Sequence, residues 1–288
     1  MKISFLFLVY DRIYNEQIWK ENFFDLLDES DYSIHIHHKP GQNRLGDYFR
    51  SHSIPNCIKT KWADISLVIA QTLLLKQALK DKDNHRFVFL SQSCIPVKNP
   101  KEVVDKLRKE ERSIFNERPL EYIPRYENIS RILSSCEIKK ASQWCILNRK
   151  HAEIICNQFH KESWYGIFSN VFASDEIMYF TILNSMLNLH REILTTNDLA
   201  YATTFTNWGP IPQGPGTTGY VGPKYKYEKP KLNRVKEYSL ISEKELIDII
   251  KSDSLFARKF NIGCRVLGKK ENLKDFIKKH LTSADNHL

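Results

Sequence analysis

The sequence predicts an α/β fold with a mostly parallel central sheet flanked by helices. Strand-like and helix-like segments alternate from the N-terminus, the runs at 3–10 and 86–90 are almost entirely apolar, and the second ends abruptly in Ser91, Gln92 and Ser93. Such alternation favours parallel strands, which are buried on both faces and therefore lack a polar side. With 288 residues, 42% of them hydrophobic, the chain is long and apolar enough to fold around a core.

The expected elements of the first half follow from the spacing of apolar residues. They are a strand at 3–10, a helix at 15–28, a strand at 32–37, a helix at 64–80, a strand at 86–90 and a helix at 100–109. Asp64 is the expected N-cap of its helix. Pro100 suits the first turn of the last helix, where its missing N–H costs nothing.

In the second half we expect a strand at 142–148 and helices at 149–160 and 174–187. Ser174 is the expected N-cap of the last of these helices, with two acids in its first turn. The segment 207–223 holds five of the ten glycines and four of the eleven prolines, which is typical of a long loop over a site. We expect one domain over 1–280 and a frayed tail over 281–288.

Several classes of protein are excluded or disfavoured by composition. No stretch approaches the roughly 20 apolar residues that cross a bilayer, and the short apolar run at the N-terminus is followed by Asp11 and Arg12 instead of a cleavage site. The six cysteines show no CxxC spacing. We expect reduced thiols and a cytoplasmic protein, with peripheral association at a membrane left open.

The charge of the chain is concentrated near its C-terminus. The net charge is +9, and 16 Lys and Arg against 9 Asp and Glu leave +7 in residues 221–288. The densest part is 224–236, which includes Arg234 and Lys236. Nucleic acid, an acidic membrane surface or a diphosphate would satisfy this charge, and so would a purely solvated face.

Two acidic pairs are candidates for chemistry. Asp175 and Glu176 could hold a base on a rigid element, although acids in a first helical turn are also favoured by the helix dipole. Asp81 and Asp83 match the DxD pattern that holds a divalent ion in many nucleotide-sugar transferases. They precede the strand at 86–90, whereas such a motif should follow it, so we expect surface acids there and no divalent metal.

The histidines at 35, 37 and 38 are a third candidate cluster. Only His35 and His37 share a face of their strand, and a metal site would need further ligands, so we expect these histidines to mark a partly exposed strand end. The chain holds no P-loop, GxGxxG or GxSxG pattern, which disfavours common kinase, dinucleotide-binding and hydrolase classes.

Seven motifs together resemble the Core-2/I-branching glycosyltransferase family, which includes branching N-acetylglucosaminyltransferases, peptide xylosyltransferases and plant relatives. In the family's order, they are Tyr32–His38, Lys61-Trp62 with Ile65-Ser66, Arg86–Pro96, Ser142–Trp144, Ser174–Glu176, Thr204–Trp208 and Ser254–Phe260. The resemblance runs from about residue 2 to 262. It implies a GT-A-like (Rossmann-like) glycosyltransferase domain, a UDP-sugar donor, inversion at the anomeric carbon and no metal or other cofactor.

The resemblance also implies roles for single residues. Glu176 is similar to the family's catalytic base, and Lys259 to its lysine on the donor diphosphate, with Arg258 beside it. The second diphosphate cation falls nearest Lys236, with Arg234 close by. His37 stands near the expected uridine site, where the family's branching enzymes have an acid. The candidate donor and acceptor contacts are Trp62, Gln92, Ser93, Trp144, Asp175 and Trp208, although the tryptophans could equally belong to the core.

The function that we expect is transfer of GlcNAc or xylose from a UDP donor to a hydroxyl of a glycan or other acceptor, without nucleic acid as a partner. Two alternatives remain. One is a nucleic-acid or anionic-surface binder that uses 224–236, whose binding would weaken steeply with salt. The other is a catalytically inactive, lectin-like relative, against which the presence of Glu176 and Lys259 argues.

Overall fold

A computed structural model describes residues 1–118, 127–134, 137–159, 161–186, 189–196, 203–207 and 235–282. The chain divides into two compact units. Unit 1 comprises residues 1–13, 27–92 and 104–195, and unit 2 comprises residues 14–26, 93–103 and 196–288. The prediction of a single domain over 1–280 stays a prediction.

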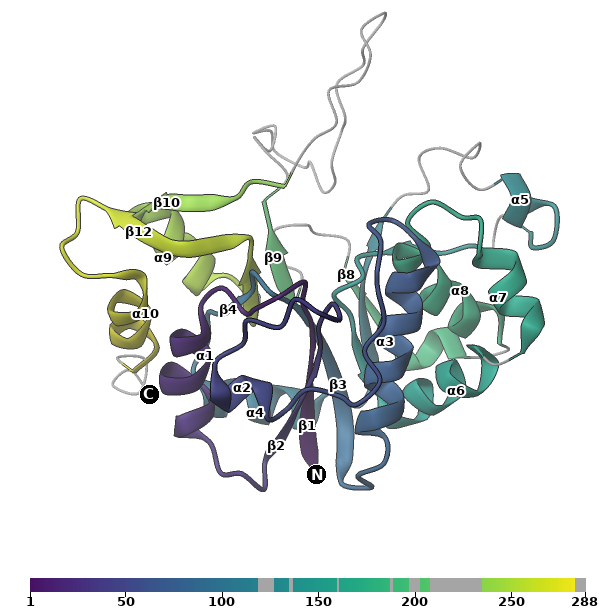
Figure 1. The fold of residues 1–288 in the computed structure, drawn as a ribbon, viewed down its shortest axis with the longest axis horizontal. Helices are drawn as coiled ribbons and strands as arrows, with labels where there is room; N and C mark the ends of the chain where they lie inside the picture. The colour runs from purple at the N-terminus through teal and green to yellow at the C-terminus, as the bar shows by residue number, and fades with distance from the viewer. Residues whose placement is uncertain are drawn as a thin grey trace, which may run out of the picture. The chain divides into compact units, whose positions relative to one another are not determined.

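Unit 1 is built on a seven-stranded sheet with the order β2-β1-β3-β7-β5-β6, in which β8 pairs with β5 (Figure 1). The strands are β1 (Lys2–Leu8), β2 (Tyr32–His37), β3 (Asn84–Ser91), β5 (Ser113–Arg118), β6 (Lys140–Ala141), β7 (Ile146–Asn148) and β8 (Ile193–Thr196). The two most extensive pairings, β1 with β2 and β1 with β3, are parallel, whereas β7 runs antiparallel to both β3 and β5. The predicted α/β fold with a mostly parallel central sheet is therefore confirmed.

The central strands are buried because their sequences are apolar on both faces. Six of the seven residues of β1 are buried, and so are seven of the eight residues of β3. The helices of unit 1 are α2 (Asp47–Arg50), α3 (Ile65–Ala78), α5 (Glu127–Ser130), α6 (Arg149–Phe159), α7 (Glu162–Phe168) and α8 (Met178–Ser185), with short 3-10 turns η3 (Ser174–Glu176) and η4 (Leu189–Glu192). The helix α3 contacts all three parallel strands.

The helix α3 begins at the edge of the sheet where the three parallel strands end. Asp64 caps it as predicted, because its Oδ1 accepts a hydrogen bond from the backbone N–H of Ser66 at 2.9 Å. The helix connects β2 to β3 and so runs back along parallel strands, which places its first turn at the edge where β1, β2 and β3 end. At the opposite edge, the N–H of Lys2 donates to the carbonyl of Asp83 at 2.7 Å.

One predicted helix is interrupted. The prediction of a helix over 174–187 capped by Ser174 is wrong, because Ser174–Glu176 forms the separate 3-10 turn η3 and the α-helix begins at Met178. Ala173, in a left-handed conformation, occupies the N-cap position of η3, and the buried Ser174 hydroxyl makes no hydrogen bond. The acids at 175 and 176 therefore do not lie in the first turn of an α-helix.

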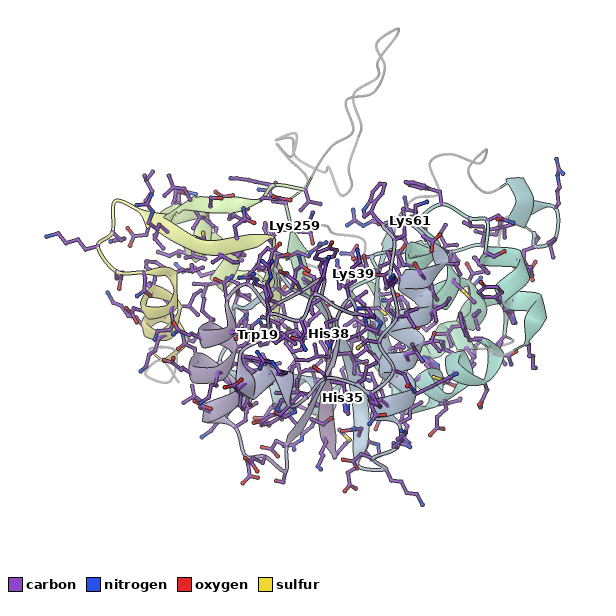
Figure 2. All side chains as sticks on the ribbon, in the orientation of Figure 1. Trp19, His35, His38, Lys39, Lys61 and Lys259 are labelled. Atoms are coloured by element: carbon purple, nitrogen blue, oxygen red, sulfur yellow. The ribbon has the colours of Figure 1, made fainter. Side chains whose placement is uncertain are left out.

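Unit 2 contains two small sheets, β4-β11-β9 and β10-β12. Its elements are α1 (Glu16–Asn22), η1 (Phe24–Leu26), β4 (Ile95–Pro96), β9 (Thr204–Thr206), β10 (Tyr238–Ser242), α9 (Glu243–Lys251), β11 (Phe256–Arg258), β12 (Phe260–Leu267) and α10 (Leu273–Thr282), while α4 (Pro100–Lys109) begins in unit 2 and ends in unit 1. Buried Trp19 donates from Nε1 to the carbonyl of Cys94 at 2.9 Å and stacks on Phe24 (Figure 2). Leu281 is buried within α10, so ordered structure continues into the predicted tail.

Candidate active site

Four polar or aromatic side chains lie at the edge of unit 1 where the parallel strands end. Tyr10 follows β1, His37 ends β2, Lys39 comes two residues later, and Gln92 follows β3. Figure 2 shows His38 and Lys39 beyond His35 along this part of the chain. In α/β sheets, ligands bind at the carboxyl ends of the strands, so a binding site is expected at this edge.

His37 is a neutral histidine at this edge. Burial, and then the neighbouring His38, lower its pKa to about 4. Its Nε2 accepts a hydrogen bond from the backbone N–H of Ile58 at 3.0 Å, and its Nδ1 is buried without a hydrogen-bond partner. Because Nε2 accepts, the proton of the neutral ring belongs on Nδ1, which leaves a buried donor unsatisfied.

Gln92 and Lys39 both bond to Tyr10. The Oε1 atom of Gln92 accepts from the backbone N–H of Tyr10 at 2.6 Å. Lys39 Nζ lies 4.7 Å from the centre of the Tyr10 ring and donates to its hydroxyl at 3.3 Å. These contacts join the ends of the three parallel strands and place an exposed aromatic ring and a cation beside His37.

The turn that carries Glu176 is tied to the loop in front of α3. The N–H of Ala173 donates to the carbonyl of Ala63 at 2.9 Å, and the N–H of Glu176 donates to the carbonyl of Ala173 at 2.9 Å. The Glu176 side chain is partly exposed, and its Oε2 lies 3.6 Å from Nζ of Lys140. The arrangement holds a carboxylate at the same edge of unit 1 as the strand ends, open to solvent and beside one cation.

Asp175 differs from its neighbour. Burial, and then the charge of Glu176, raise the pKa of Asp175 to about 7. Its Oδ1 is buried and has no hydrogen-bond partner. At neutral pH a large fraction of Asp175 is therefore protonated, so that the two adjacent residues carry less than two full charges.

Asp81 and Asp83 lie at the opposite edge of the strands, as expected from their place before β3. Asp81 Oδ2 is 3.1 Å from Nζ of Lys2, and its Oδ1 accepts from the backbone N–H of Asp83 at 2.9 Å. These hydrogen bonds and the charge of Lys2 lower the pKa of Asp81. The pair closes the turn that leads into β3.

In unit 2, Lys259 lies at the junction between β11 and β12. Its carbonyl accepts from the N–H of Tyr238 at 2.8 Å, and its Nζ lies 3.6 Å from Oε1 of Glu237. Burial, and then the neighbouring Arg258, lower the pKa of Lys259, while Glu237 opposes the shift. Ser93, which is buried, accepts at its carbonyl from the N–H of Phe260 at 2.9 Å and so helps to fix the same junction.

The predicted second cation is engaged elsewhere in unit 2. Lys236 Nζ contacts both carboxylate oxygens of Glu245, at 2.8 and 2.9 Å, and lies 4.8 Å from the centre of the Tyr238 ring. Arg234, Trp208 and nearly all of the basic segment 224–236 fall outside the described residues. Their roles stay predictions.

The two described candidate tryptophans have opposite surroundings. Trp144 is buried and packs in the main hydrophobic core of unit 1. Trp62 is exposed and packs edge-to-face against Phe172. Trp62 is therefore at the surface beside the Glu176 turn, whereas Trp144 fills the interior.

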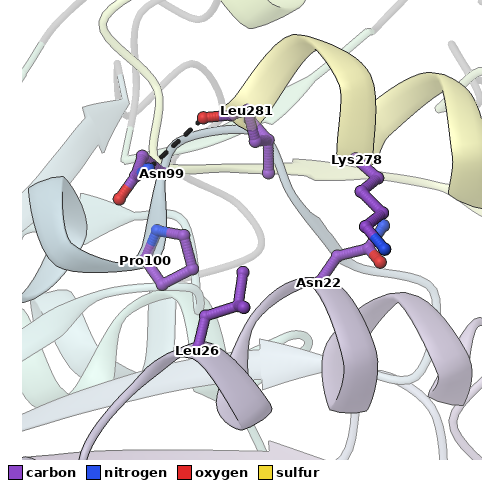
Figure 3. A pocket seen from close by; sticks show the side chains of 6 residues that line it. All are labelled: Asn22, Leu26, Asn99, Pro100, Lys278 and Leu281. Atoms are coloured by element: carbon purple, nitrogen blue, oxygen red, sulfur yellow. Dashed lines mark hydrogen bonds between the residues drawn. The ribbon is translucent and has the colours of Figure 1, made fainter. Parts of the chain in front are cut away.

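A pocket in unit 2 is too small to be a substrate site. It is lined by Asn22, Leu26, Asn99, Pro100, Lys278 and Leu281 (Figure 3). Its volume accommodates about one water molecule. Among the described residues, no three His, Cys, Asp or Glu side chains form a group that could hold a metal ion. The five cysteines in the described part of the chain form no disulfide. None of the helices described has the length and the apolar composition of a membrane span.

The sequence patterns missed three neighbours of the candidate site, Tyr10, Lys39 and Lys140. The position of Tyr10 directly after an apolar strand is a signal that could have found it, and Lys39 follows a strand end in the same way. Lys140 is 36 positions before Glu176, and only the fold brings them together.

A protein-family model and a plant glycosyltransferase match this chain in sequence. A sequence model described as "Branch: Core-2/I-Branching enzyme" matches residues 3–238, a range that includes His37, Glu176 and Lys236 but ends before Lys259. "Glycosyltransferase BC10" of Oryza sativa subsp. japonica is 32% identical over 164 residues, which are 54% of this chain and 40% of the rice protein. The match thus spans less than half of that relative.

Two solved structures are distant neighbours. A glycosyltransferase involved in glycosylation of the major capsid of PBCV-1 has a TM-score of 0.37 and 10% identity, with 98% of this chain and 99% of that chain covered. A197 from STIV has a TM-score of 0.27 and 11% identity over 53% of this chain and 68% of that chain. Neither likeness is close enough to bear on the function. The family match, which extends over well more than half of the chain, confirms the resemblance seen in the sequence motifs, and the chain belongs to the Core-2/I-branching enzyme family, a family of glycosyltransferases.

Proposed function

We propose that this protein transfers a sugar, GlcNAc or xylose, from a UDP donor to a hydroxyl group of a glycan, with inversion and without a divalent metal. The observation that carries the proposal is the turn at Asp175 and Glu176, which presents one partly exposed carboxylate beside Lys140 and one partly buried carboxyl group whose pKa is raised to about 7. Family membership supports the reaction class.

In the proposed reaction, the carboxylate of Glu176 accepts the proton of the acceptor hydroxyl while the hydroxyl oxygen attacks the anomeric carbon. The bond between that carbon and the phosphate oxygen breaks, and UDP leaves with the bonding electron pair. One direct displacement inverts the anomeric configuration. A base fixed on a rigid turn typically contributes about 100- to 10,000-fold to such a step.

The surroundings of Glu176 suit a base. A protonated Asp175 adds no second negative charge beside Glu176, and the ammonium of Lys140 lies 3.6 Å from the Glu176 carboxylate. The short hydrogen bonds through Ala173 hold the turn in place. The rigid position limits the geometry that the acceptor hydroxyl must adopt.

The leaving diphosphate needs positive charge. We assign this role to Lys259, whose ammonium is half-buried and has a counter-ion, Glu237, at 3.6 Å, a loose contact that a diphosphate could replace. His37 is fully buried and bonded to Ile58, so it would support the strand ends near the uracil from beneath and add no charge there. Asp81, paired with Lys2 at the other edge of the strands, has no part in this scheme.

The test is a screen of UDP-sugars by UDP release in the presence of mixed oligosaccharide acceptors and excess EDTA. We expect release that depends on both one donor and an acceptor, and a product whose anomeric proton coupling shows the configuration opposite to that of the donor. Absence of transfer with every UDP-sugar would reject the proposed function. A retained configuration would reject direct displacement.

A further inference from the structure

An exposed pair of aromatic rings lies next to the turn that carries Glu176. Trp62, which follows the Lys61 labelled in Figure 2, is 77% exposed, more than any other large hydrophobic side chain in the described part of the chain, and Phe172 is 41% exposed. Their ring centres are 5.4 Å apart, and their planes meet at 77°. Single exposed aromatics are common on protein surfaces, but two that pack on each other in solvent form a preassembled apolar surface.

The backbone beside each ring has an unusual conformation. Ala63 follows Trp62 with φ 56°, and Ala173 follows Phe172 with φ 55°; among the described residues, these are the two non-glycine positions with positive φ. The left-handed region is unfavourable for an alanine, and such residues persist where the surrounding structure enforces them, often at functional sites. The hydrogen bond from Ala173 N–H to the Ala63 carbonyl joins the two loops and sets both rings side by side.

The short stretch of chain between Phe172 and Glu176 limits the distance between their backbones. Four positions separate Phe172 from Glu176, so their Cα atoms are at most about 14 Å apart even in a fully extended chain. The 3-10 turn at 174–176 shortens this distance further. One or two sugar rings would cover such a span.

We propose that Trp62 and Phe172 form an aromatic corner that binds a pyranose ring of the acceptor glycan, next to the sugar whose hydroxyl reacts at Glu176. This assignment rests on the proposed function and narrows the glycan acceptor to an oligosaccharide or glycoside. One face of a pyranose presents C–H groups with partial positive charge, which the electron-rich face of an aromatic ring attracts. Two nearly perpendicular walls hold a ring by one face and one edge, which also orients the attached sugar.

The corner suits the acceptor better than the donor. A nucleotide donor brings a diphosphate, which needs cations, whereas the corner itself is made of two uncharged side chains with Lys61 as a neighbour along the chain. The rings share their backbone bridge with the turn of the proposed base, and the base acts on the acceptor hydroxyl. The acceptor is therefore expected to be an oligosaccharide or glycoside, and a single free sugar should be a poor substrate.

The first test compares kinetic constants of Trp62→Ala and Phe172→Ala with those of the unchanged protein. We expect the acceptor KM to rise about 10- to 100-fold for an oligosaccharide, with the donor KM and the slow hydrolysis of the UDP-sugar without acceptor unchanged. Trp62→Phe should recover part of the loss. Tyr165→Ala, which removes another exposed aromatic side chain of unit 1, is the matched control and should leave every constant unchanged.

If Trp62→Ala and Phe172→Ala transferred sugar with an unchanged acceptor KM, the assignment of the aromatic corner would be overturned and the proposed function would stand. A rise in the donor KM instead would overturn its assignment to the acceptor. If the unchanged protein showed neither transfer nor hydrolysis, the proposed function would fail by itself. The corner would then be tested by tryptophan fluorescence during titration with chito-oligosaccharides and xylo-oligosaccharides: a shift that is lost in Trp62→Phe supports it, and no shift with any glycan overturns it.

Discussion

Two acidic pairs in unit 1 look alike in the sequence and differ in their surroundings. Asp81 and Asp83 are held in a turn at the amino ends of the parallel strands, where Lys2 neutralises Asp81 and hydrogen bonds lower its pKa. Asp175 and Glu176 lie at the other edge, where burial raises the pKa of Asp175 to about 7 and Glu176 stays partly exposed. Acids that are hydrogen-bonded and have a lowered pKa are typical of structural turns. A carboxyl group with a raised pKa and a buried oxygen without a hydrogen-bond partner indicates a functional site. The proposed function therefore assigns chemistry to the pair at 175 and 176, and a structural role to the pair at 81 and 83.

The largest effect is expected from Glu176→Gln, which keeps the shape of the side chain and removes its basicity. Turnover should fall by about 100- to 10,000-fold, while the affinity for the UDP-sugar stays within a few fold because the donor contacts persist. Steady-state kinetics and donor calorimetry measure the two quantities. Asp175→Asn is the control and should cost less; near-normal turnover in folded Glu176→Gln would contradict the role of the base.

The next effect concerns the leaving group. Lys259→Ala should weaken UDP binding and slow transfer together, each by about 10- to 1,000-fold, because the cation meets a diphosphate in both the ground state and the transition state. Calorimetry with UDP is the measurement. Lys244→Ala removes a lysine that is well exposed and paired with Asp248 in the same unit, so it should have no effect. Unchanged UDP affinity in Lys259→Ala would leave Arg258, Arg234 and Lys236 as candidates.

A smaller effect, on stability, follows from the raised pKa of Asp175. The folded state holds a proton on Asp175 that the unfolded state releases at lower pH, so the contribution of Asp175 to the free energy of unfolding should be greatest below pH 4 and fall as the pH rises through about 7. A shift of about three pH units sets an upper limit of about 4 kcal/mol, and solvent access to this partly buried side chain reduces the effect. Asp175→Asn should remove this dependence, so that the variant gains stability relative to the unchanged protein between pH 5 and 8 in thermal unfolding. A pH-independent difference between the two proteins would contradict a buried, protonated Asp175.

The smallest effects are expected at the other acidic pair. Asp81→Asn with Asp83→Asn removes a surface ion pair, which contributes at most about 1 kcal/mol to stability. Transfer should be unaffected by excess EDTA, because neither the proposed base nor the proposed diphosphate cation depends on a divalent ion. Loss of transfer with EDTA and its recovery with Mn²⁺ would contradict the metal-free scheme.

The three parallel strands β1, β2 and β3 and the helices α3, α4 and α6 were predictable because their signals are local. The apolar runs of β1 and β3, the Asp64 cap and Pro100 each depend on neighbours within a few positions. The η3 turn was not predictable, since Ser174-Asp175-Glu176 is also a good helix start, and the non-helical backbone of Ile177 that separates the turn from α8 has no signal in the sequence. Phe172 and Lys140 were missed because their contacts with Trp62 and Glu176 cross long stretches of sequence.

The most direct test of the difference between the two acidic pairs is one assay of two matched variants. The rate of sugar transfer is measured, with excess EDTA present, for Glu176→Gln and for the double variant Asp81→Asn with Asp83→Asn. We predict a loss of at least about 100-fold for the first and a rate close to that of the unchanged protein for the second. A severe loss in the double variant together with normal transfer by Glu176→Gln would contradict the account.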